Sequence, residues 1–366
     1  MESTQHLFGL LLAGGKGKRF WPLSREDHPK QLLQLFSSMT LIEETYQRIK
    51  PMVPLDRIML ATSQTLALRF RRLFNEVESD NFIIEPIPRN TAPCIGVAAR
   101  RCLARDPDAI LAVLPSDHYV ADPTMFREIL AAAVHHAAMG KIVTLGITPT
   151  HPETGYGYIR FGDFEPDPEN PECRHRARSI GAFVEKPDPE TAFAYLKTGR
   201  YLWNSGIFVF KASVILEAFR EHMPDVYEQS ERLLVLEGRA DPDPAAVLDA
   251  WKGMEAISID YGVMEKLKEG VVVIPSSFGW SDVGSWRALA SFPSGESQNF
   301  ECGRVVAVDS KENVLYSTSG LLATIGVNNM VVVVTRGAVL VCPLDRTQDV
   351  KALVDEIEHR NLTEFL

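Results

Sequence analysis

The segment Leu7 to Arg19 reads LFGLLLAGGKGKR, an apolar run that leads directly into three glycines, Gly14, Gly15 and Gly17. An apolar run of this length followed by glycines predicts a buried strand with a loop at its carboxyl end. Glycines let the backbone approach an anion closely and point N–H groups at it, so the loop is a candidate phosphate site. The alternative interpretation is a solvated turn that carries a few lysines.

Outward from this segment, short apolar runs alternate with helical patterns over the first 150 residues. The alternation predicts strands at 7–13, 58–61, 82–85, 109–114 and 141–147, and helices at 40–50, 64–77, from 91 and at 123–139. Thr40 and Glu43 have the spacing of a capping box. The strands are continuously apolar, which is typical of a mainly parallel sheet covered on both faces, and we predict an α/β, Rossmann-like domain.

The second half of the chain is less regular. A strand at 183–184, a helix at 189–197 and a strand at 206–210 are interpreted as insertions on the same sheet. The composition changes near residue 297, where five short β-rich runs follow at 305–308, 314–316, 321–325, 330–335 and 338–342. Their regular spacing suggests a small sandwich or a β-helix coil. We therefore predict domains at 1–296 and 297–366, with 330–334 buried and a terminal helix that has Val350, Leu353, Val354 and Ile357 on one face.

Composition excludes several classes of protein. The chain has 366 residues and a formal net charge of −10, which disfavours a nucleic-acid binder because its field repels phosphate backbones. No apolar run approaches the roughly 20 residues of a membrane-spanning helix, so no membrane partner is expected. The five cysteines are scattered without metal-ligand spacing, and a reduced cytoplasm is the expected location.

The glycine loop differs from two common phosphate-binding loops. Phe20 stands where a dinucleotide-binding loop needs its third glycine, and the Gly-Lys-Ser/Thr of a P-loop is absent. Between residues 14 and 30, five basic and two acidic residues give a local charge of +3. Lys30 follows Pro29, which fixes the backbone, so its ammonium suits a charge aimed at phosphate. The alternative for Lys30 is an exposed side chain after a turn.

Two aspartates are candidate site residues: Asp117 as a metal ligand, and Asp282 as a carboxylate placed by a tight loop. Asp117 follows the apolar run that ends at Leu114, at the strand edge where open α/β sheets bind ligands. Asp282 lies in GWSDVGSW, between two glycines and two tryptophans. Mg²⁺ takes carboxylate and phosphate oxygens together, which would let an acid lie beside a phosphate. For both residues the alternative is a helix N-cap or a turn aspartate.

The motifs taken together resemble the sugar-1-phosphate nucleotidylyltransferases, and within them the mannose-1-phosphate guanylyltransferases. The matching segments run in family order over about the first 290 residues, with Lys18 where many members have a small polar residue. They are LLAGGKGKRFWPLSREDHPKQ (11–31), EPIPRNTAP (85–93), LPSDH (114–118), GITPTHPETGYGYIR (146–160), FVEKPD (183–188), WNSGIF (203–208), SIDYGVMEK (258–266) and GWSDVGSW (279–286).

The resemblance implies a role for each matched residue and a C-terminal domain that is a small left-handed β-helix. It assigns Leu12, Ala13, Gly14, Gly15, Gly17, Arg19 and Lys30 to the nucleotide and its phosphates, with Arg89, Asn90 and Thr91 near the guanine base. It assigns Lys186 to the sugar phosphate, Tyr156, Gly157, Glu185 and Asn204 to the mannose, and Asp117 and Asp282 to Mg²⁺. Arg19, Lys30 and Lys186 would be the catalytic cations.

The implied reaction converts GTP and mannose 1-phosphate into GDP-mannose and pyrophosphate. A phosphate monoester has a second pKa near ~6, so its oxygen attacks the α-phosphorus without a general base. Two alternatives stay open: thymidylyl or uridylyl transfer to glucose 1-phosphate, and a non-catalytic regulatory subunit, although Lys30, Asp117 and Asp282 are all present. Long bacterial members carry a further isomerase domain, and the length of this chain predicts a single activity. The apolar C-terminal strands favour a homodimer.

Overall fold

Strand β1 (Leu7–Ala13) has the predicted bounds and lies inside a nine-stranded sheet in the computed structural model. The structure describes residues 2–15, 17–167, 169–170, 172–239, 241–292, 294 and 298–366. Residue contacts divide the chain into two compact units. Unit 1 comprises 1–14, 45–116 and 120–280, and unit 2 comprises 15–44, 117–119 and 281–366. The boundary predicted between 296 and 297 lies outside the described residues and stays a prediction.

The sheet of unit 1 has the order β3-β2-β1-β4-β9-β6-β10-β8-β7. Its remaining strands are β2 (Ile58–Ser63), β3 (Phe82–Glu85), β4 (Ile110–Pro115), β6 (Ile142–Ile147), β7 (Tyr158–Phe164), β8 (Arg178–Val184), β9 (Tyr201–Lys211) and β10 (Val271–Ser276). The half from β3 to β4 is parallel, as the continuous apolar runs predict. The other half is mixed, because β9 runs antiparallel to both β4 and β6, and β7 and β8 form an antiparallel pair. The predicted insertions therefore belong to the same sheet, but β8 and β9 run antiparallel to β10, β4 and β6, and β9 lies inside the sheet between β4 and β6.

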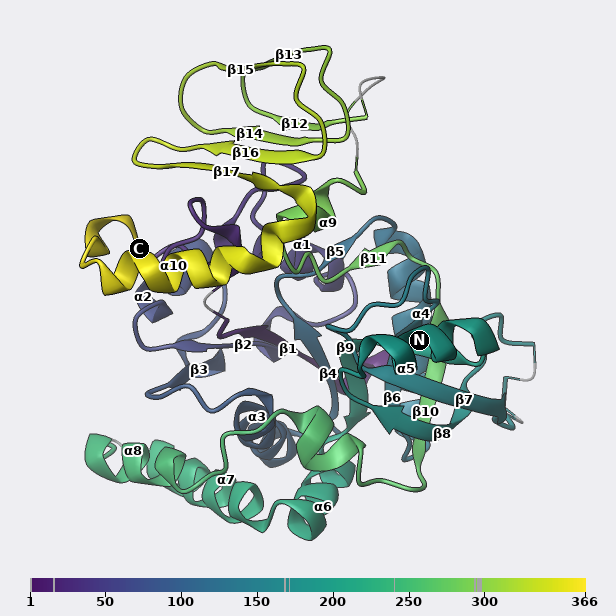
Figure 1. Cartoon of the computed structure of the whole chain (residues 1–366). Coiled ribbons are helices and arrows are strands. Elements are labelled where there is room, and N and C mark those ends of the chain that lie inside the picture. Colours follow the sequence, from purple (N-terminus) through teal and green to yellow (C-terminus); the bar gives the residue numbers. More distant parts are fainter. Residues whose placement is uncertain are drawn as a thin grey trace. The chain divides into compact units, whose positions relative to one another are not determined.

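Helices of unit 1 cover the sheet and supply its core. They are α2 (Ala67–Leu73), α3 (Thr91–Arg105), α4 (Pro123–Ala138), α5 (Pro189–Thr198), α6 (Ala212–His222), α7 (Pro224–Glu237) and α8 (Pro244–Lys252), while α1 (Leu41–Ile49) crosses the boundary between the units. Helices α3, α6, α7 and α8 gather together (Figure 1) around buried side chains that include Phe8, Phe210 and Trp251. The predicted capping box is present, since the Thr40 backbone N–H donates to Glu43 at 2.8 Å. Helix α2 is shorter than predicted.

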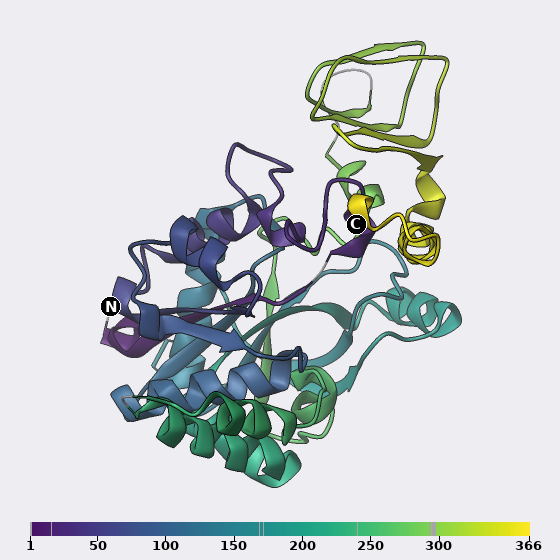
Figure 2. The ribbon, with the colours of Figure 1, turned by 90° about the vertical axis from the view of Figure 1, so that its left-hand side faces the viewer.

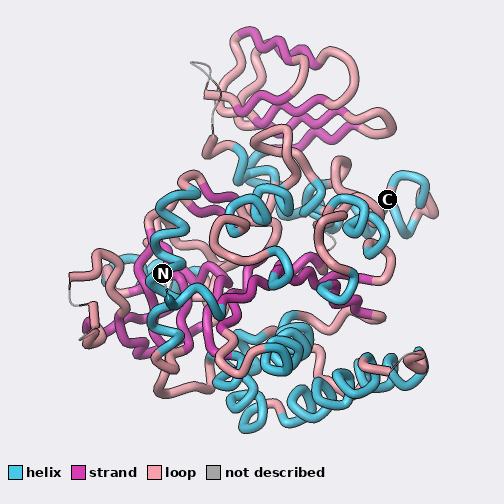
Figure 3. The backbone as a smooth tube through the Cα atoms, turned by 180° about the vertical axis from the view of Figure 1, so that it is seen from behind, coloured by secondary structure: helices cyan, strands magenta, loops and turns pink. Residues whose placement is uncertain are grey.

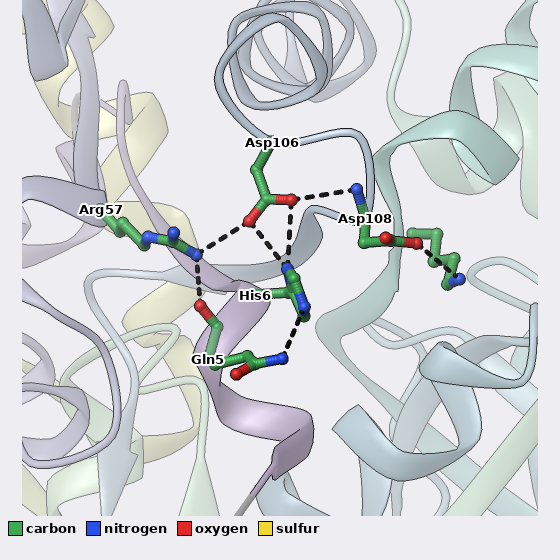
Figure 4. Close-up of polar contacts among 6 residues, drawn as sticks. Gln5, His6, Arg57, Asp106 and Asp108 are labelled. Carbon is green, nitrogen blue, oxygen red and sulfur yellow. Dashed lines mark hydrogen bonds and ion pairs between the residues drawn. The ribbon is translucent and has the colours of Figure 1, made fainter.

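The amino edge of β1 is tied to the end of α3 by a polar cluster (Figure 4). Asp106 contacts His6 Nδ1 at 2.9 Å and Arg57 at 3.1 Å, and it accepts from the Asp108 backbone N–H at 3.0 Å. Burial alone would raise the pKa of Asp106, but the His6 hydrogen bond, the Asp108 N–H and the Arg57 charge hold it below the usual value. The cluster joins three segments that are distant in sequence, which fits a structural role at the edge opposite the glycine loop.

Unit 2 contains a coil of short strands, which is seen nearly end-on in Figure 2 and as strands joined by loops in Figure 3. Its strands are β12 (Phe300–Cys302), β13 (Val305–Val308), β14 (Val314–Ser317), β15 (Leu322–Ile325), β16 (Met330–Val334) and β17 (Val339–Pro343). Strand β14 pairs in parallel with β12 and β16, and β13 pairs in parallel with β15. Successive turns that stack in parallel make this a β-helix, one of the two predicted architectures. Its handedness stays a prediction.

The buried and exposed faces of unit 2 follow the sequence pattern closely. Of the predicted buried run 330–334, residues 331–333 are buried, while Met330 and Val334 at its ends are only half-buried. In the terminal helix α10 (Val350–His359), Val350 and Val354 are buried, but Leu353 is 39% exposed, so the predicted stripe is narrower than expected. The remaining elements are β5 (Tyr119–Val120), β11 (Trp280–Ser281) and α9 (Trp286–Leu289). A second core, with Phe20, Trp286 and Val354 among its members, joins the coil to the segment after the glycine loop.

Candidate functional site

The glycine loop of unit 2 is held by its own backbone and by Lys30. Gly17 has φ +63°, which favours glycine, and a Cβ at this position would lie 2.5 Å from Lys30 Cβ. The Gly17 carbonyl accepts from the Phe20 N–H at 3.0 Å and from Ser24 Oγ at 2.7 Å, and Gln31 Nε2 donates to the Gly15 carbonyl at 3.0 Å. The glycine at 17 is therefore required by close packing on Lys30. Lys16 lies outside the described residues.

Lys30 is buried, contrary to the alternative of an exposed lysine after a turn. Lys30 is the first residue of the short helix η3 (Lys30–Leu32), which follows Pro29 at φ −70°. Only 7% of the Lys30 residue is exposed. The ammonium contacts Asp117 Oδ2 at 3.0 Å and donates to the Asp282 carbonyl at 2.5 Å. Three residues that lie far apart in the sequence thus meet at one side-chain nitrogen within unit 2.

Neither aspartate is a helix N-cap. The cap of α4 is Asp122, which accepts from the Thr124 N–H at 3.0 Å, and Asp282 instead closes a turn by accepting from the Gly284 N–H at 3.0 Å. Burial, the largest single effect, would raise the pKa of the Asp117 carboxyl, but the charges of Lys30 and His118 and the hydrogen bond from Lys30 together hold the pKa below its usual value. An ionised carboxylate in this position has the charge that a divalent cation requires.

The donor set fits Mg²⁺ better than a transition metal. Among the described residues, no group of three or more His, Cys, Asp or Glu side chains could hold a metal ion. Mg²⁺ is commonly bound by one or two carboxylates, with the remaining positions filled by substrate phosphates and water. Asp117 and Asp282 have the carboxylates that such a site would need, and their role toward a metal ion stays a prediction.

Arg19 lies in the short helix η2 (Lys18–Phe20), two residues after Gly17, and its side chain is exposed. Within the described part of the chain, it takes part in no ion pair. An exposed guanidinium next to a glycine loop is available to a ligand phosphate, as the resemblance implies for this residue.

The residues predicted to bind the sugar phosphate gather in unit 1. The Lys186 N–H donates to the Tyr156 carbonyl at 3.2 Å, and the Asn204 N–H donates to the Gly157 carbonyl at 2.8 Å. A Cβ at Gly157 would collide with the Glu185 carboxylate, so the glycine admits that side chain. The Lys186 ammonium contacts Glu185 Oε1 at 2.9 Å. These contacts bring all five predicted sugar-site residues into one group.

Two acids of this group were missed by the sequence analysis, although both lie in the quoted segment SIDYGVMEK. Asn204 Nδ2 donates to Asp260 Oδ1 at 2.8 Å, and Glu265 Oε1 accepts from the Glu185 N–H at 3.0 Å. Burial and then the charge of Asp260 raise the pKa of Glu185, while burial raises the pKa of Asp260. Carboxyl oxygens and the Asn204 amide together offer hydrogen-bond acceptors and donors, which suits a polyhydroxyl ligand.

The residues predicted near the base lie where α3 begins, also in unit 1. Asn90 has φ +63°, and its side chain accepts from the Thr91 N–H at 2.9 Å. Thr91 Oγ1 accepts from the Ile259 N–H at 3.0 Å, and Arg89 Nη2 donates to the Lys252 carbonyl at 3.1 Å. These contacts shape the segment, so its role toward a base stays a prediction, as does that of Leu12, Ala13 and Gly14 at the end of β1.

A buried carboxyl lies at the end of β3, beside the end of β1. Glu85 is 8% exposed, and a Cβ at Gly14 would lie 3.7 Å from Glu85 Oε1. Burial raises the pKa of Glu85 to about 7, although the Arg89 N–H acts in the opposite direction. Sequence reasoning missed this residue because Glu85 reads only as the last position of a strand.

We expect Glu85→Gln to stabilise unit 1 at pH 8. The pKa of Glu85 is higher in the folded state, so stability is full below the unfolded value of 4.5 and is lost as the pH rises through 7. That span corresponds to at most about 3 to 4 kcal/mol of unfolding free energy. A neutral glutamine avoids this loss of stability at alkaline pH. Urea unfolding from pH 4 to 9 should show the gain only at the alkaline end. Glu190→Gln, an exposed carboxyl, is the control, and a gain that is independent of pH would contradict the explanation.

Comparison with known proteins identifies both parts of the chain. Residues 8–297 match the family model described as nucleotidyl transferase, and residues 303–357 match the one described as MannoseP isomerase/GMP-like beta-helix domain. The chain is 39% identical to a mannose-1-phosphate guanylyltransferase of Salmonella muenchen, and the match covers 98% of this chain and 75% of the relative. It is 38% identical to a mannose-1-phosphate guanylyltransferase of Escherichia coli K12, and that match covers 96% of this chain and 73% of the relative.

A solved structure shows the same architecture. It is described as mannose-1-phosphate geranyltransferase from Thermus thermophilus, with a TM-score of 0.85, 38% identity, and coverage of 96% of this chain and 99% of the other. The similarity therefore extends over the nine-stranded sheet and the coil. In the described part of the chain, no helix has the length and apolar character needed to cross a bilayer.

Proposed function

The chain belongs to the mannose-1-phosphate guanylyltransferase family of nucleotidyl transferases, and on that premise we propose that it transfers GMP from GTP to α-D-mannose 1-phosphate, giving GDP-mannose and pyrophosphate. The observation that carries the proposal is the meeting of Lys30 with Asp117 and the Asp282 backbone beside Gly17. A buried ammonium, an ionised carboxylate and a glycine loop within one unit suit a triphosphate with its metal ion.

The groups of unit 2 are assigned to GTP. N–H groups of the glycine loop would hold phosphate oxygens, and Arg19 would offset the charge of the triphosphate from the solvent side. Lys30, fixed by Pro29 and by Asp117, would place its charge on the phosphates without a further change of conformation. Asp117 and Asp282 would hold Mg²⁺, which when bound neutralises phosphate charge and helps pyrophosphate to leave.

The groups of unit 1 are assigned to mannose 1-phosphate. Lys186 would pair with the sugar phosphate, which is largely dianionic at neutral pH and attacks the α-phosphorus without losing a proton to the protein. Glu185, Asn204 and Asp260 would bind sugar hydroxyls, since together they offer donors and acceptors. The residues thus act by orienting two anions and offsetting their repulsion, and none has to serve as a nucleophile or a general base.

A pyrophosphate-release matrix tests the proposal. GTP, ATP, UTP and dTTP are each combined with mannose 1-phosphate and glucose 1-phosphate, and we expect release to be highest for GTP with mannose 1-phosphate. Highest release for dTTP or UTP with glucose 1-phosphate would replace the proposed substrates. Absence of release in all eight combinations would favour the regulatory subunit.

We expect Lys186→Ala to raise the KM for mannose 1-phosphate by about 10- to 100-fold, the loss of one charge-assisted contact of ~1.5–3 kcal/mol. The KM for GTP should change far less, because Lys186 belongs to the sugar-site group. Initial rates with each substrate varied in turn measure both constants. Lys197→Ala, an exposed lysine on α5, is the control. An equal rise of both constants would argue against the assignment of Lys186 to the sugar phosphate.

We also infer a homodimer. Strands β13, β15 and β17 expose apolar side chains, namely Val306, Val308, Ile325, Val339 and Val341. Val306, Val308 and Ile325 lie on the paired strands β13 and β15, whereas Val339 and Val341 lie on β17 of the other sheet of the coil. Contiguous exposed apolar side chains are a common feature of subunit interfaces. Light scattering of the purified chain measures the oligomeric state, and a monomer at assay concentration would refute the inference.

A further inference from the structure

The terminal helix α10 packs on the segment that follows the glycine loop, and both belong to unit 2. Trp21 is 7% exposed, and it shares one buried cluster with Val350 and Val354 of α10. Helix α10 (yellow in Figure 1) contacts η2, which carries Arg19. A helix from the end of the chain thus covers the segment that we assign to the triphosphate.

Polar contacts fix the same segment on both sides. Lys18 Nζ contacts Asp355 Oδ1 at 2.9 Å and Glu358 Oε2 at 3.8 Å, both on α10. The Trp21 indole N–H donates to the Phe365 carbonyl at 2.8 Å, and the Trp21 carbonyl accepts from the Trp286 indole N–H at 3.1 Å. The segment therefore has one anchor in α10, one in the residues that follow it and one in α9.

These anchors flank the residues that face the ligand. Arg19 lies between the anchored residues Lys18 and Trp21 in the sequence. On the other side of Lys18, Gly17 packs directly against Lys30. An open pocket of about 210 Å³ is lined by residues of both the segment and α10, among them Ser24, Arg25 and Val354. Because the space there is not filled by side chains, the segment has room to shift once its anchors are cut. Such a shift would displace Arg19 and alter the contact between Gly17 and Lys30.

We propose that α10 is a brace for the phosphate-binding loop, and that Lys18 and Trp21 are positioning residues that hold residues 17–24 in the conformation that binds GTP. The proposal rests on the assignment of this loop to the nucleotide. An exposed ion pair contributes little to global stability, so loss of the Lys18 pair is expected to change the position and mobility of the loop rather than the melting temperature. Val354 is buried, so its truncation also lowers global stability, and thermal unfolding measures that part of its effect.

Hydrogen exchange of the ligand-free full chain tests the brace without any assumption about the substrate. The double variant Asp355→Asn/Glu358→Gln removes both partners of Lys18, and Val354→Ala removes part of the apolar contact. We expect amides of residues 17–24 to exchange about 3-fold faster or more in both, as for a segment that loses local stability. The matched controls are Glu356→Gln, which breaks the Arg360 pair on the same helix, and Leu353→Ala on its exposed face. Unchanged exchange in the test variants, or equal acceleration in the controls, would overturn the brace.

Kinetics then separate positioning from general damage. In Asp355→Asn/Glu358→Gln we expect the KM for GTP to rise by up to about 5-fold, with the KM for mannose 1-phosphate unchanged, and the difference should shrink at high salt as the pair is screened. The charge-reversed pair Lys18→Glu/Asp355→Lys should restore part of the loss seen in Lys18→Glu alone. An equal rise in both constants, or no rescue, would overturn the positioning role. If the wild-type chain does not use GTP, the proposed function fails, while the exchange result still decides whether α10 holds the loop.

Discussion

Replacing Lys30 by methionine is expected to lower kcat/KM for nucleotidyl transfer by about 10²- to 10³-fold, the usual cost of losing one preorganised charge at a reacting group. Methionine keeps the length and the apolar stem that packs on Gly17, so the variant removes the ammonium with little change of volume. Its loss leaves the phosphates without their buried cation and leaves Asp117 without the contact at 3.0 Å. Steady-state rates with both substrates near saturation, and well below it, measure the effect on kcat and on kcat/KM.

The matched control is Lys211→Met, which breaks another Lys–Asp pair, between Lys211 and Asp108 at 3.4 Å. Lys211 lies at the end of β9, and nothing assigns it to a ligand, so its variant should retain the wild-type rate. Thermal unfolding of both variants shows whether the fold persists. A Lys30→Met enzyme within a few fold of the wild type would mean that this ammonium only neutralises Asp117, and would remove it from the catalytic set.

The sequence predicts the site only where its residues are local. The glycines after β1 and the acid after β4 are readable because parallel strands end at the same edge of a sheet, and the register that pairs Leu12 with Pro115 confirms that these two strands do so. The contact of Lys30 with Asp282 spans 252 positions and depends on how the chain returns, which no local pattern encodes. The burial of Lys30 depends on the same long-range contacts, so the sequence could only leave an exposed side chain open as an alternative.

Three further differences also depend on tertiary structure that local patterns do not encode. The antiparallel course of β9 is not encoded in its apolar pattern, because a strand buried on both faces reads alike in either direction. Asp260 was overlooked because its contact with Asn204 forms only when a helical turn meets β9. Leu353 occupies a helical position next to the buried Val354, and the periodicity could not tell which of the two faces the core.

Replacing Asp117 by asparagine is expected to abolish Mg²⁺-dependent turnover, with a loss of at least about 10²- to 10³-fold, while the fold persists. Asparagine is isosteric and keeps an oxygen for the Lys30 ammonium, so the change is confined to one negative charge. The neutral amide is a poor partner for a hard divalent cation, and the apparent affinity for Mg²⁺ in the rate assay should fall with the rate. Asp108→Asn, the acid of the control pair, should leave both quantities unchanged.

The comparison that decides the role of Asp117 is GTP binding measured with and without Mg²⁺. If the carboxylate acts through the cation, Asp117→Asn binds GTP as the wild type does when the metal is withheld, and it loses only the strengthening that Mg²⁺ brings. If the carboxylate instead serves to hold Lys30 in place, binding weakens equally in both conditions, and Asp117→Asn reproduces the pattern of Lys30→Met. A variant with a near-normal rate would contradict both roles, because the buried contact at 3.0 Å would then have no consequence for the reaction.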